Sequence, residues 1–195
     1  MAACTRPKVP RDAQACFAPE GNGEETIAAC TRVLDSGALD AAERAKAFFQ
    51  RGNRYSLNGS NDLAIQDYDS ALRLVPDNLA TLYNRGTAYL ETNRYDLAIR
   101  DFDEAVRLKP DFALAYGNRG AAYLSKGEFD RAILDYNRSL ALDPTNFRHL
   151  ANRGTAYLHQ GSYDVAIMDF DEALRLTPTS GRATSLRPSA TTGRR

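Results

Sequence analysis

Residues 79–112, LATLYNRGTAYLETNRYDLAIRDFDEAVRLKPDF, decide how the rest of the chain folds. The same residue types reappear when the sequence is shifted by 34 positions in either direction. The tripeptide NRG of residues 84–86 recurs at residues 118–120 and 152–154, and a weaker copy, QRG, lies at residues 50–52. Four copies at one fixed period identify a repeat protein.

Both halves of this unit carry apolar or small side chains at steps of three and four. In the first half they are Leu82, Gly86 and Tyr89, and in the second half Ala98, Ile99, Phe102, Ala105 and Leu108. This spacing places them on one face of an α-helix, so each copy is predicted to be a pair of amphipathic helices. Over the four copies the predicted helices span residues 41–57 and 61–74, 79–91 and 95–108, 113–125 and 129–142, and 147–159 and 163–176.

Glycine, asparagine and proline mark the ends of these helices. Between the two halves of a copy lies Gly59, Gly127 or Gly161, because a helix that ends in a left-handed residue favours glycine there. The second copy has Asn93, the next most tolerant residue, at this place. A proline restricts the residue before it and stops the second helix of each copy. These prolines are Pro76, Pro110, Pro144 and Pro178.

The order of glycine, tyrosine, alanine, aromatic residue, alanine and proline in this unit resembles the tetratricopeptide repeat. The resemblance covers residues 45–178 and implies an all-α fold, a right-handed superhelical solenoid of helical hairpins. The repeats have approximate bounds 45–78, 79–112, 113–146 and 147–180. The asparagine and arginine before the glycine, and the stretch IAACTRVLDSG at residues 27–37, are more similar to repeat proteins of bacteria, which are often exported.

Length and composition suit one soluble domain. The chain has 195 residues, 43% of them apolar and 26% charged, and no apolar run long enough to cross a membrane. Residues 1–23 have three basic and two acidic side chains, and residues 179–195 have four arginines and no acid. The whole chain has 25 basic and 25 acidic side chains, so residues 24–178 have 18 basic and 23 acidic ones and are net negative. This argues against nucleic acid as a partner, because such a surface needs a basic stripe.

The two ends of the chain lack a helical period. Residues 1–23 predict an irregular lead-in, and residues 179–195 a disordered basic tail. The lead-in lacks the apolar core of a signal peptide, so the chain as it stands is expected in the cytoplasm. A missing upstream signal would place it in the periplasm instead. Residues 24–44 predict a capping helix and linker before the first hairpin. The apolar face of this cap is expected to comprise Ile27, Cys30, Thr31 and Leu34.

The three cysteines, Cys4, Cys16 and Cys30, all precede residue 31, and none has the spacing of a metal site. Neither a metal nor a cofactor is predicted. A Cys16–Cys30 disulfide would pin the lead-in onto the first helix in an oxidising compartment, which the similarity to exported proteins favours. The alternative is that Cys30 is a small buried apolar residue of that helix.

No catalytic motif rises above the repeat pattern, so an enzyme is not predicted. Aspartates that recur once per hairpin suggest carboxylate chemistry, but their repetition indicates a structural role. An arginine precedes each of them at one constant spacing, on the facing helix of the same hairpin. We therefore expect four structural ion pairs: Arg51 with Asp67, Arg85 with Asp101, Arg119 with Asp135, and Arg153 with Asp169.

The inner wall of the solenoid, formed in this family by the first helix of each hairpin, is the surface that can differ between copies. By position, the residues of this wall expected to bind a peptide are Phe49, Gln50, Asn53, Tyr83, Asn84, Thr87, Asn118, Arg148, Asn152 and Thr155. Further wall positions are Lys46, Glu91, Leu114, Gly117, Ala121 and Ala151.

One asparagine per repeat lines the groove in some relatives, such as the superhelix of the enzyme that attaches N-acetylglucosamine to serine and threonine. A side-chain amide both donates and accepts, so a row of amides can satisfy the backbone of an extended peptide. Asn84, Asn118 and Asn152, extended by Gln50, match such a row. The alternative is that each asparagine bonds to the neighbouring repeat and contacts no ligand.

These observations predict a non-enzymatic scaffold that binds a peptide or protein segment in its concave groove. The alternative is a fragment or adaptor of a larger assembly, which delivers partners to a catalytic subunit. The fourth hairpin is expected to leave an apolar face uncovered and to form a homodimer through it. The members of this face are Tyr157, Ile167, Phe170, Leu174 and Leu176.

Overall fold

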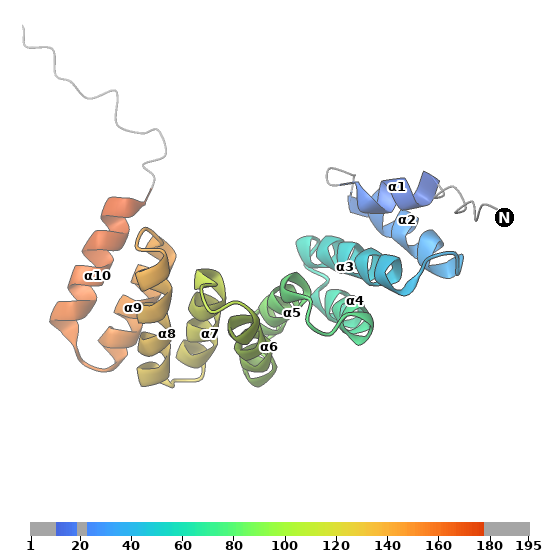
Figure 1. Cartoon of the computed structure of the whole chain (residues 1–195). Coiled ribbons are helices and arrows are strands. Elements are labelled where there is room, and N and C mark those ends of the chain that lie inside the picture. Colours follow the sequence, from blue (N-terminus) through green and yellow to red (C-terminus); the bar gives the residue numbers. More distant parts are fainter. Residues whose placement is uncertain (1–10, 19–22, 178–195) are drawn as a thin grey trace, which may run out of the picture.

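The computed structural model describes residues 11–18 and 23–177, which form an arched stack of α-helices (Figure 1). Ten helices and no strand occur in these residues. The helices are α1 (Arg11–Phe17), α2 (Gly23–Asp35), α3 (Ala41–Leu57), α4 (Asn61–Leu74), α5 (Leu79–Glu91), α6 (Tyr95–Leu108), α7 (Ala113–Ser125), α8 (Phe129–Leu142), α9 (Phe147–His159) and α10 (Tyr163–Leu176). The eight helices α3–α10 have the bounds predicted from the repeat.

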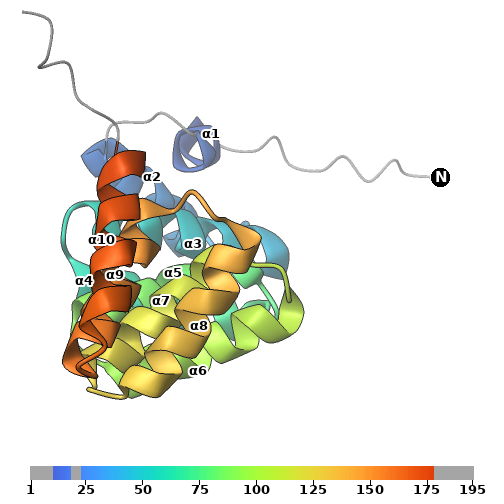
Figure 2. The ribbon, with the colours of Figure 1, turned by 90° about the vertical axis from the view of Figure 1, so that its left-hand side faces the viewer.

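Each pair of helices forms a hairpin, and the second helix of a hairpin packs on the first helix of the next. Thus α4 packs on α5, α6 on α7, and α8 on α9. In Figure 1, α3 and α5 lie on the inner side of the arc and α4 and α6 on the outer side. Figure 2 views the stack from its C-terminal end, where α10 lies in front of the other hairpins.

The turns inside the hairpins have the left-handed backbone predicted from glycine and asparagine. Gly59, Gly127 and Gly161 have φ angles of 76°, 76° and 77°. Asn93 has a φ of 59°, and it is the only non-glycine residue with positive φ in the described part of the chain. Asparagine tolerates this conformation better than most residues, so the second hairpin keeps the same turn without glycine.

The core runs through the stack as a continuous apolar layer. Its largest fully buried side chains include Tyr68, Phe102 and Tyr136, one from the second helix of each of the first three hairpins. A Cβ atom at Gly86 would lie 2.8 Å from the Phe102 ring, so glycine at this place lets the aromatic ring fill the hairpin. The recurring glycine and aromatic residue therefore form one packing unit.

The N-terminal residues differ from the sequence-based expectation. The prediction of an irregular lead-in was wrong for Arg11–Phe17, which form α1 and pack against α2 and α3. Alternating charge and small residues hide this short helix from a periodicity argument. Residues 1–10, 19–22 and 178–195, including Cys4 and the predicted basic tail, lie outside the described residues.

The buried face of α2 is also rotated from the predicted one. Its buried residues are Thr26, Ala29, Cys30 and Val33, whereas Ile27, Thr31 and Leu34 are only partly buried. The Sγ atoms of Cys16 and Cys30 form a disulfide of 2.08 Å between α1 and α2. Because α1 packs on the cysteine side of α2, the small residues of that side face the core.

Candidate functional site

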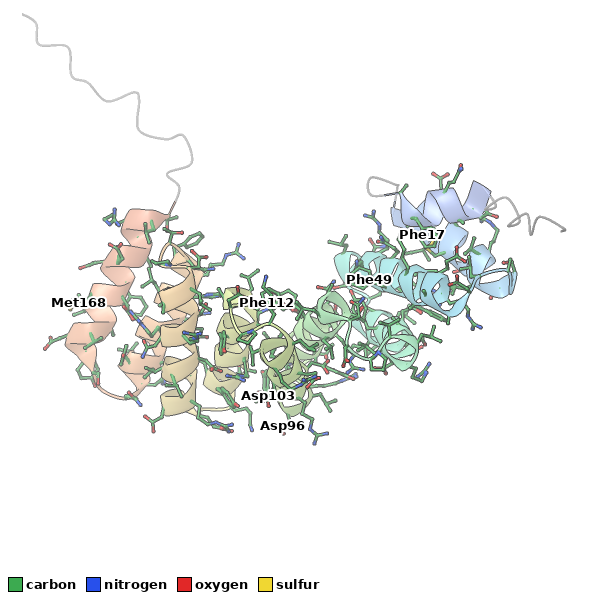
Figure 3. All side chains as sticks on the ribbon, viewed as in Figure 1. Phe17, Phe49, Asp96, Asp103, Phe112 and Met168 are labelled. Carbon is green, nitrogen blue, oxygen red and sulfur yellow. A yellow bond between two sulfur atoms is a disulfide. The ribbon has the colours of Figure 1, made fainter. Side chains whose placement is uncertain are left out.

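The side chains predicted to form the inner wall come from the first helices of the four hairpins, α3, α5, α7 and α9. Figure 3 shows Phe49 on the inner side of the arc and Asp96 on the outer side. Arg148 is exposed and the other nine predicted wall residues are half-buried. These nine are Phe49, Gln50, Asn53, Tyr83, Asn84, Thr87, Asn118, Asn152 and Thr155.

An amide–amide hydrogen bond joins the first two hairpins on this wall. Asn84 Nδ2–H donates to Asn53 Oδ1 at 2.8 Å, and the Tyr68 hydroxyl donates to the same oxygen at 2.8 Å. Burial raises the pKa of Tyr68, so this hydroxyl keeps its proton at neutral pH. The Asn84 amide thus links two hairpins, as the second interpretation of the asparagine row expects.

Asn118 makes the corresponding link between the second and third hairpins. Its Nδ2 donates to the Tyr83 hydroxyl at 3.1 Å and to Thr87 Oγ1 at 3.3 Å. The Thr87 hydroxyl donates its own proton to the Tyr83 carbonyl oxygen at 2.9 Å, so it acts as acceptor toward Asn118. The Asn118 carbonyl oxygen has no hydrogen-bond donor among the described residues.

The row of amides is not uniform along the wall. The acceptors of Asn118 lie 31 and 35 positions earlier in the chain. At the same offsets before Asn152 stand Ala121 and Gly117, which have no polar side-chain atom. Asn152 therefore cannot form the inter-hairpin bond of the first two copies, and Gln50 forms no such bond within residues 23–177.

A groove of about 630 Å³ lies between α5, α7 and the start of α9. It brings together four of the ten predicted wall residues, Tyr83, Thr87, Asn118 and Arg148. The remaining lining residues are Leu90, Glu91, Leu114, Asp143, Thr145, Asn146, Phe147 and His149. Leucine and aromatic side chains next to amide, hydroxyl and charged groups are typical of sites that bind peptides or small molecules.

The third hairpin lacks the aromatic side chain that the first two carry on the wall. Phe49 and Tyr83 stand at the position that Gly117 occupies in the third copy. A Cβ atom at Gly117 would lie 2.1 Å from His149 Cε1, so the imidazole of α9 fills the space that glycine leaves. His149 was not among the site residues predicted from the sequence, although a glycine in place of an aromatic residue indicates that a neighbouring side chain fills the space.

The imidazole of His149 is buried and has a defined hydrogen-bond partner. Ser139 Oγ lies 2.7 Å from His149 Nδ1 and 2.8 Å from the Ala113 carbonyl oxygen. Because the hydroxyl has one proton and the carbonyl only accepts, Nδ1–H donates to Oγ and Nε2 carries no proton in the neutral ring. Burial lowers the pKa of His149, against the charge of Asp143, so the neutral form prevails at pH 7.

The four arginine–aspartate pairs lie within the hairpins. Each guanidinium donates through Nε and Nη2 to both carboxylate oxygens at 2.6–2.8 Å, and the aspartates are buried. Burial alone lowers the pKa of Arg85, but the hydrogen bonds and charge of Asp101 outweigh it, so the pKa lies above its ordinary value. These pairs join the two helices of a hairpin, and none of them lines the groove between α5, α7 and α9.

Each of these arginines also reaches one element back along the stack. Arg85 Nη1 donates to Asp69 at 2.6 Å and Arg119 Nη1 to Asp103 at 2.7 Å. The equivalent acceptors are Asn137 for Arg153 at 2.7 Å and Thr31 for Arg51 at 2.9 Å. This third contact was not predicted from the sequence, and it links the ion pairs of successive hairpins into a ladder.

Two family models of the tetratricopeptide repeat match the chain, one over residues 49–111 and 83–147 and the other over residues 120–189. This chain is a tetratricopeptide repeat protein. The fold class predicted from the sequence, an all-α solenoid of helical hairpins, is confirmed by the ten helices of the described residues and by the matching solved structures. Among curated proteins, none matches the chain.

Solved structures of MamA resemble this tetratricopeptide repeat protein. One MamA crystal structure is 26% identical, with a TM-score of 0.73, and the match covers 79% of this chain and 88% of MamA. MamA from Desulfovibrio magneticus RS-1, residues 41 to the end, is 21% identical with a TM-score of 0.77, covering 87% and 97% of the two chains. Both matches span most of the two chains compared. The repeat family and the 26% identical MamA structure support an interaction scaffold in general.

Two further properties concern the described residues only. No group of three or more histidine, cysteine, aspartate or glutamate side chains in residues 11–18 and 23–177 is arranged to hold a metal ion. None of the helices α1–α10 is both long enough and apolar enough to cross a membrane.

Proposed function

We propose that this protein is a non-enzymatic scaffold that binds an extended segment of a partner protein in its concave groove. The observation that carries the proposal is the groove of about 630 Å³ between α5, α7 and α9. Residues from three successive hairpins line it, so a bound segment would run across the repeats rather than along one helix.

Apolar contact is the main source of affinity that this groove offers. Leu114 is 43% exposed in the groove, although it sits in the middle of the stack. Fully burying an exposed leucine side chain contributes roughly 1.5 to 3 kcal/mol, and covering the exposed part of Leu114 contributes a fraction of that. Tyr83, which packs against Phe112 with ring centroids 5.0 Å apart, provides a rigid wall beside it. A partner segment with an apolar side chain is therefore expected at Leu114.

Polar groups at the same place would set the orientation of the bound segment. Asn118 uses its NH₂ group for the inter-hairpin link and keeps its carbonyl oxygen for a backbone N–H of the partner. Arg148 is exposed at the rim and suits a carboxylate, whereas Glu91 lies at the α5 side of the groove. The two charges of opposite sign favour one direction of the partner chain over the other.

Photo-crosslinking tests this proposal. A photoreactive benzoylphenylalanine at Leu114 should capture a partner protein from an extract of the source cells, because this side chain faces the groove. The matched control is Leu134, which is 70% exposed on α8 and lines no part of the groove. Capture at Leu114 that disappears with Arg148→Glu supports groove binding. Equal capture at both positions contradicts it.

A further inference from the structure

The end of the stack exposes side chains that are buried in every earlier hairpin. Ile65, Ile99 and Ile133, on the second helices of the first three hairpins, are 5%, 8% and 9% exposed. The equivalent Ile167 of α10 is 57% exposed. The next hairpin covers the first three isoleucines, and no described helix covers the fourth. Figure 2 shows α10 at the front of the stack, with no described helix before it.

A second apolar position follows the same rule. Leu72 and Leu140 are each 8% exposed, whereas the equivalent Leu174 is 73% exposed. Tyr163, one turn before Ile167, is 62% exposed. Residues 163, 167 and 174 lie on one face of a helix with 3.6 residues per turn, so together they form an apolar stripe along α10. Met168, 69% exposed, lies beside this stripe at the end of the arc (Figure 3).

The carboxylate of Asp171 on α10 lacks the hydrogen-bond donor that its equivalents in earlier hairpins have. Asp69 and Asp103 accept a hydrogen bond from the arginine of the next hairpin at 2.6 and 2.7 Å, and Asn137 accepts from Arg153 at 2.7 Å. Asp171 stands one repeat period after Asn137, at the same place in the fourth hairpin. No partner of Asp171 occurs among the described residues, which end before the position one repeat period after Arg153.

A second, independent acceptor repeats the pattern at the start of the helix. Asp62 accepts from Arg94 of the next hairpin, Asp96 from Lys126 at 2.7 Å, and Asp130 from Gln160. Asp164 is the fourth member of this series and has no partner within residues 23–177. The donors of the two series lie on one helix and its C-terminal turn, as Arg119 and Lys126 do, two helical turns apart.

We infer that the α10 face binds a helical hairpin of a second protein, whose first helix carries an apolar stripe and two donors about two helical turns apart, one of them arginine. The apolar part of this helix covers Ile167 and Leu174. Its arginine bonds to Asp171, and its second donor bonds to Asp164. The contact would extend the solenoid across two molecules with the geometry of its internal joints.

The charges on α10 favour a different protein over a second copy of this chain as the binding partner. Two α10 faces in twofold contact would bring four unpartnered carboxylates together, and the one arginine of α10, Arg175, is already bonded to Glu172 at 2.5 and 2.6 Å. The predicted homodimer thus leaves its acids without donors. Residues 178–195 are the other rival, since Arg187 stands one repeat period after Arg153. However, Pro188 replaces the glycine there, and Leu186 is the only large apolar residue of that segment.

The chain itself supplies a probe for this face. Helices α6 and α10 have the same residue at 11 of 14 positions. The α7–α8 hairpin, which covers α6, should therefore recognise α10. A fluorescein-labelled peptide of residues 113–146 is titrated with the full chain and followed by anisotropy. Saturable binding is expected, and Ile167→Glu in the protein should abolish it.

A double-mutant cycle identifies the hydrogen bond. Asp171→Asn in the protein and Arg119→Ala in the peptide should each weaken binding about tenfold, and the two together should weaken it little more than either alone. Glu172→Gln, which alters the neighbouring acid bonded to Arg175, is the matched control and should leave the affinity unchanged. Additive losses, or an equal loss with Glu172→Gln, would contradict the proposal.

Three further outcomes would overturn it. One is sedimentation showing a dimer that Ile167→Glu dissociates, because the occupant is then a second copy. Another is affinity for the peptide that rises more than tenfold when the chain ends at Thr177, because the segment after it then covers the face. The third outcome applies even if the isolated peptide does not fold. A second copy of residues 113–146, inserted after Thr177, should raise the melting temperature of the protein. An unchanged melting temperature would show that this hairpin does not pack on α10.

Discussion

Arg85 and Asp101 are joined by two parallel hydrogen bonds of 2.8 and 2.6 Å between the two helices of the second hairpin. The aspartate is 5% exposed, so its charge depends on this guanidinium for compensation. Burial raises the pKa of Asp101, against the hydrogen bonds from Arg85 that lower it. The pair is therefore balanced between desolvation and attraction, and breaking it should be far more costly than its net contribution.

Removing the arginine tests this balance. Arg85→Ala leaves Asp101 buried without a counter-charge, so the free energy of unfolding at pH 7 should fall by about 3 to 5 kcal/mol. The deficit should shrink as the pH falls toward 4, because the unpaired carboxyl, whose pKa is raised further, takes up a proton in the folded state. Urea denaturation at both pH values measures this. A deficit that is equal at pH 7 and pH 4 would contradict the explanation.

A buried hydroxyl distinguishes the third hairpin from the first. Among residues 11–18 and 23–177, the buried Tyr136 Oη has no hydrogen-bond partner, whereas the equivalent Tyr68 donates to Asn53. The third hairpin has Ala121 at the place of Asn53. Tyr136→Phe should therefore leave stability unchanged or raise it by up to about 1 kcal/mol, and Tyr68→Phe should lower it by about 1 kcal/mol. Thermal denaturation of both variants measures these changes. Equal losses of stability in the two variants would contradict the prediction.

Stability should depend on pH through His149. Burial holds its folded-state pKa below the value of about 6.5 that is usual in unfolded chains. The folded state thus binds fewer protons, so the contribution of this residue is complete above pH 6.5 and is lost as the pH falls through the folded pKa. The loss of stability between pH 7 and pH 5 should be smaller for His149→Gln than for the natural protein. Identical pH profiles would exclude His149 as the cause.

Gly117 and His149 should depend on each other. Gly117→Ala places a methyl group where the imidazole lies, 2.1 Å from Cε1, and should destabilise the protein by about 1 to 3 kcal/mol. In a chain that also carries His149→Ala, the added methyl group has room, so its cost should largely disappear. Denaturant unfolding of the two single variants and the double variant forms the cycle. Additive losses would show that the two sites do not share this space.

The disulfide between Cys16 and Cys30 can be tested directly. Mass spectrometry of unreduced protein, cleaved into peptides, should show Cys16 joined to Cys30. The bond joins residues 14 positions apart and restricts the conformations of the unfolded chain. Reduction removes this restriction and should therefore lower the melting temperature. The Cys16→Ala and Cys30→Ala double variant is the control and should show no effect of reductant. Free thiols at both positions after oxidation would contradict the link.

Much of the fold follows from the sequence because local and repeated signals agree. Gly59, Asn93 and Pro110 end helices through their own backbone preferences, so the bounds of α3–α10 need no tertiary information. The candidate groove was located only in part. Tyr83 and Asn118 line this groove, but the use of the asparagine amides depends on residues 31 and 35 positions earlier, in a neighbouring hairpin.

Other features depend on contacts that a periodic pattern does not encode. Whether Ile27 or Val33 of α2 faces the core depends on where α1 packs, and α1 is too short to show a period. His149 is buried because Gly117, in the preceding hairpin, opens a space for it. Single positions that break the repeat are thus where sequence reasoning loses information and where the groove acquires its shape.

The ladder of arginines gives the stack a direction. The Nη1 contact of each ladder arginine runs backward, so Asp69, Asp103 and Asn137 each accept from the hairpin that follows them. At the N-terminal side the series stops at the neutral Thr31 of α2, the helix that the disulfide joins to α1. At the C-terminal side it stops at an unused carboxylate. Within the described residues the stack therefore has one covered end and one open end, and any assembly built on this joint would grow in a single direction.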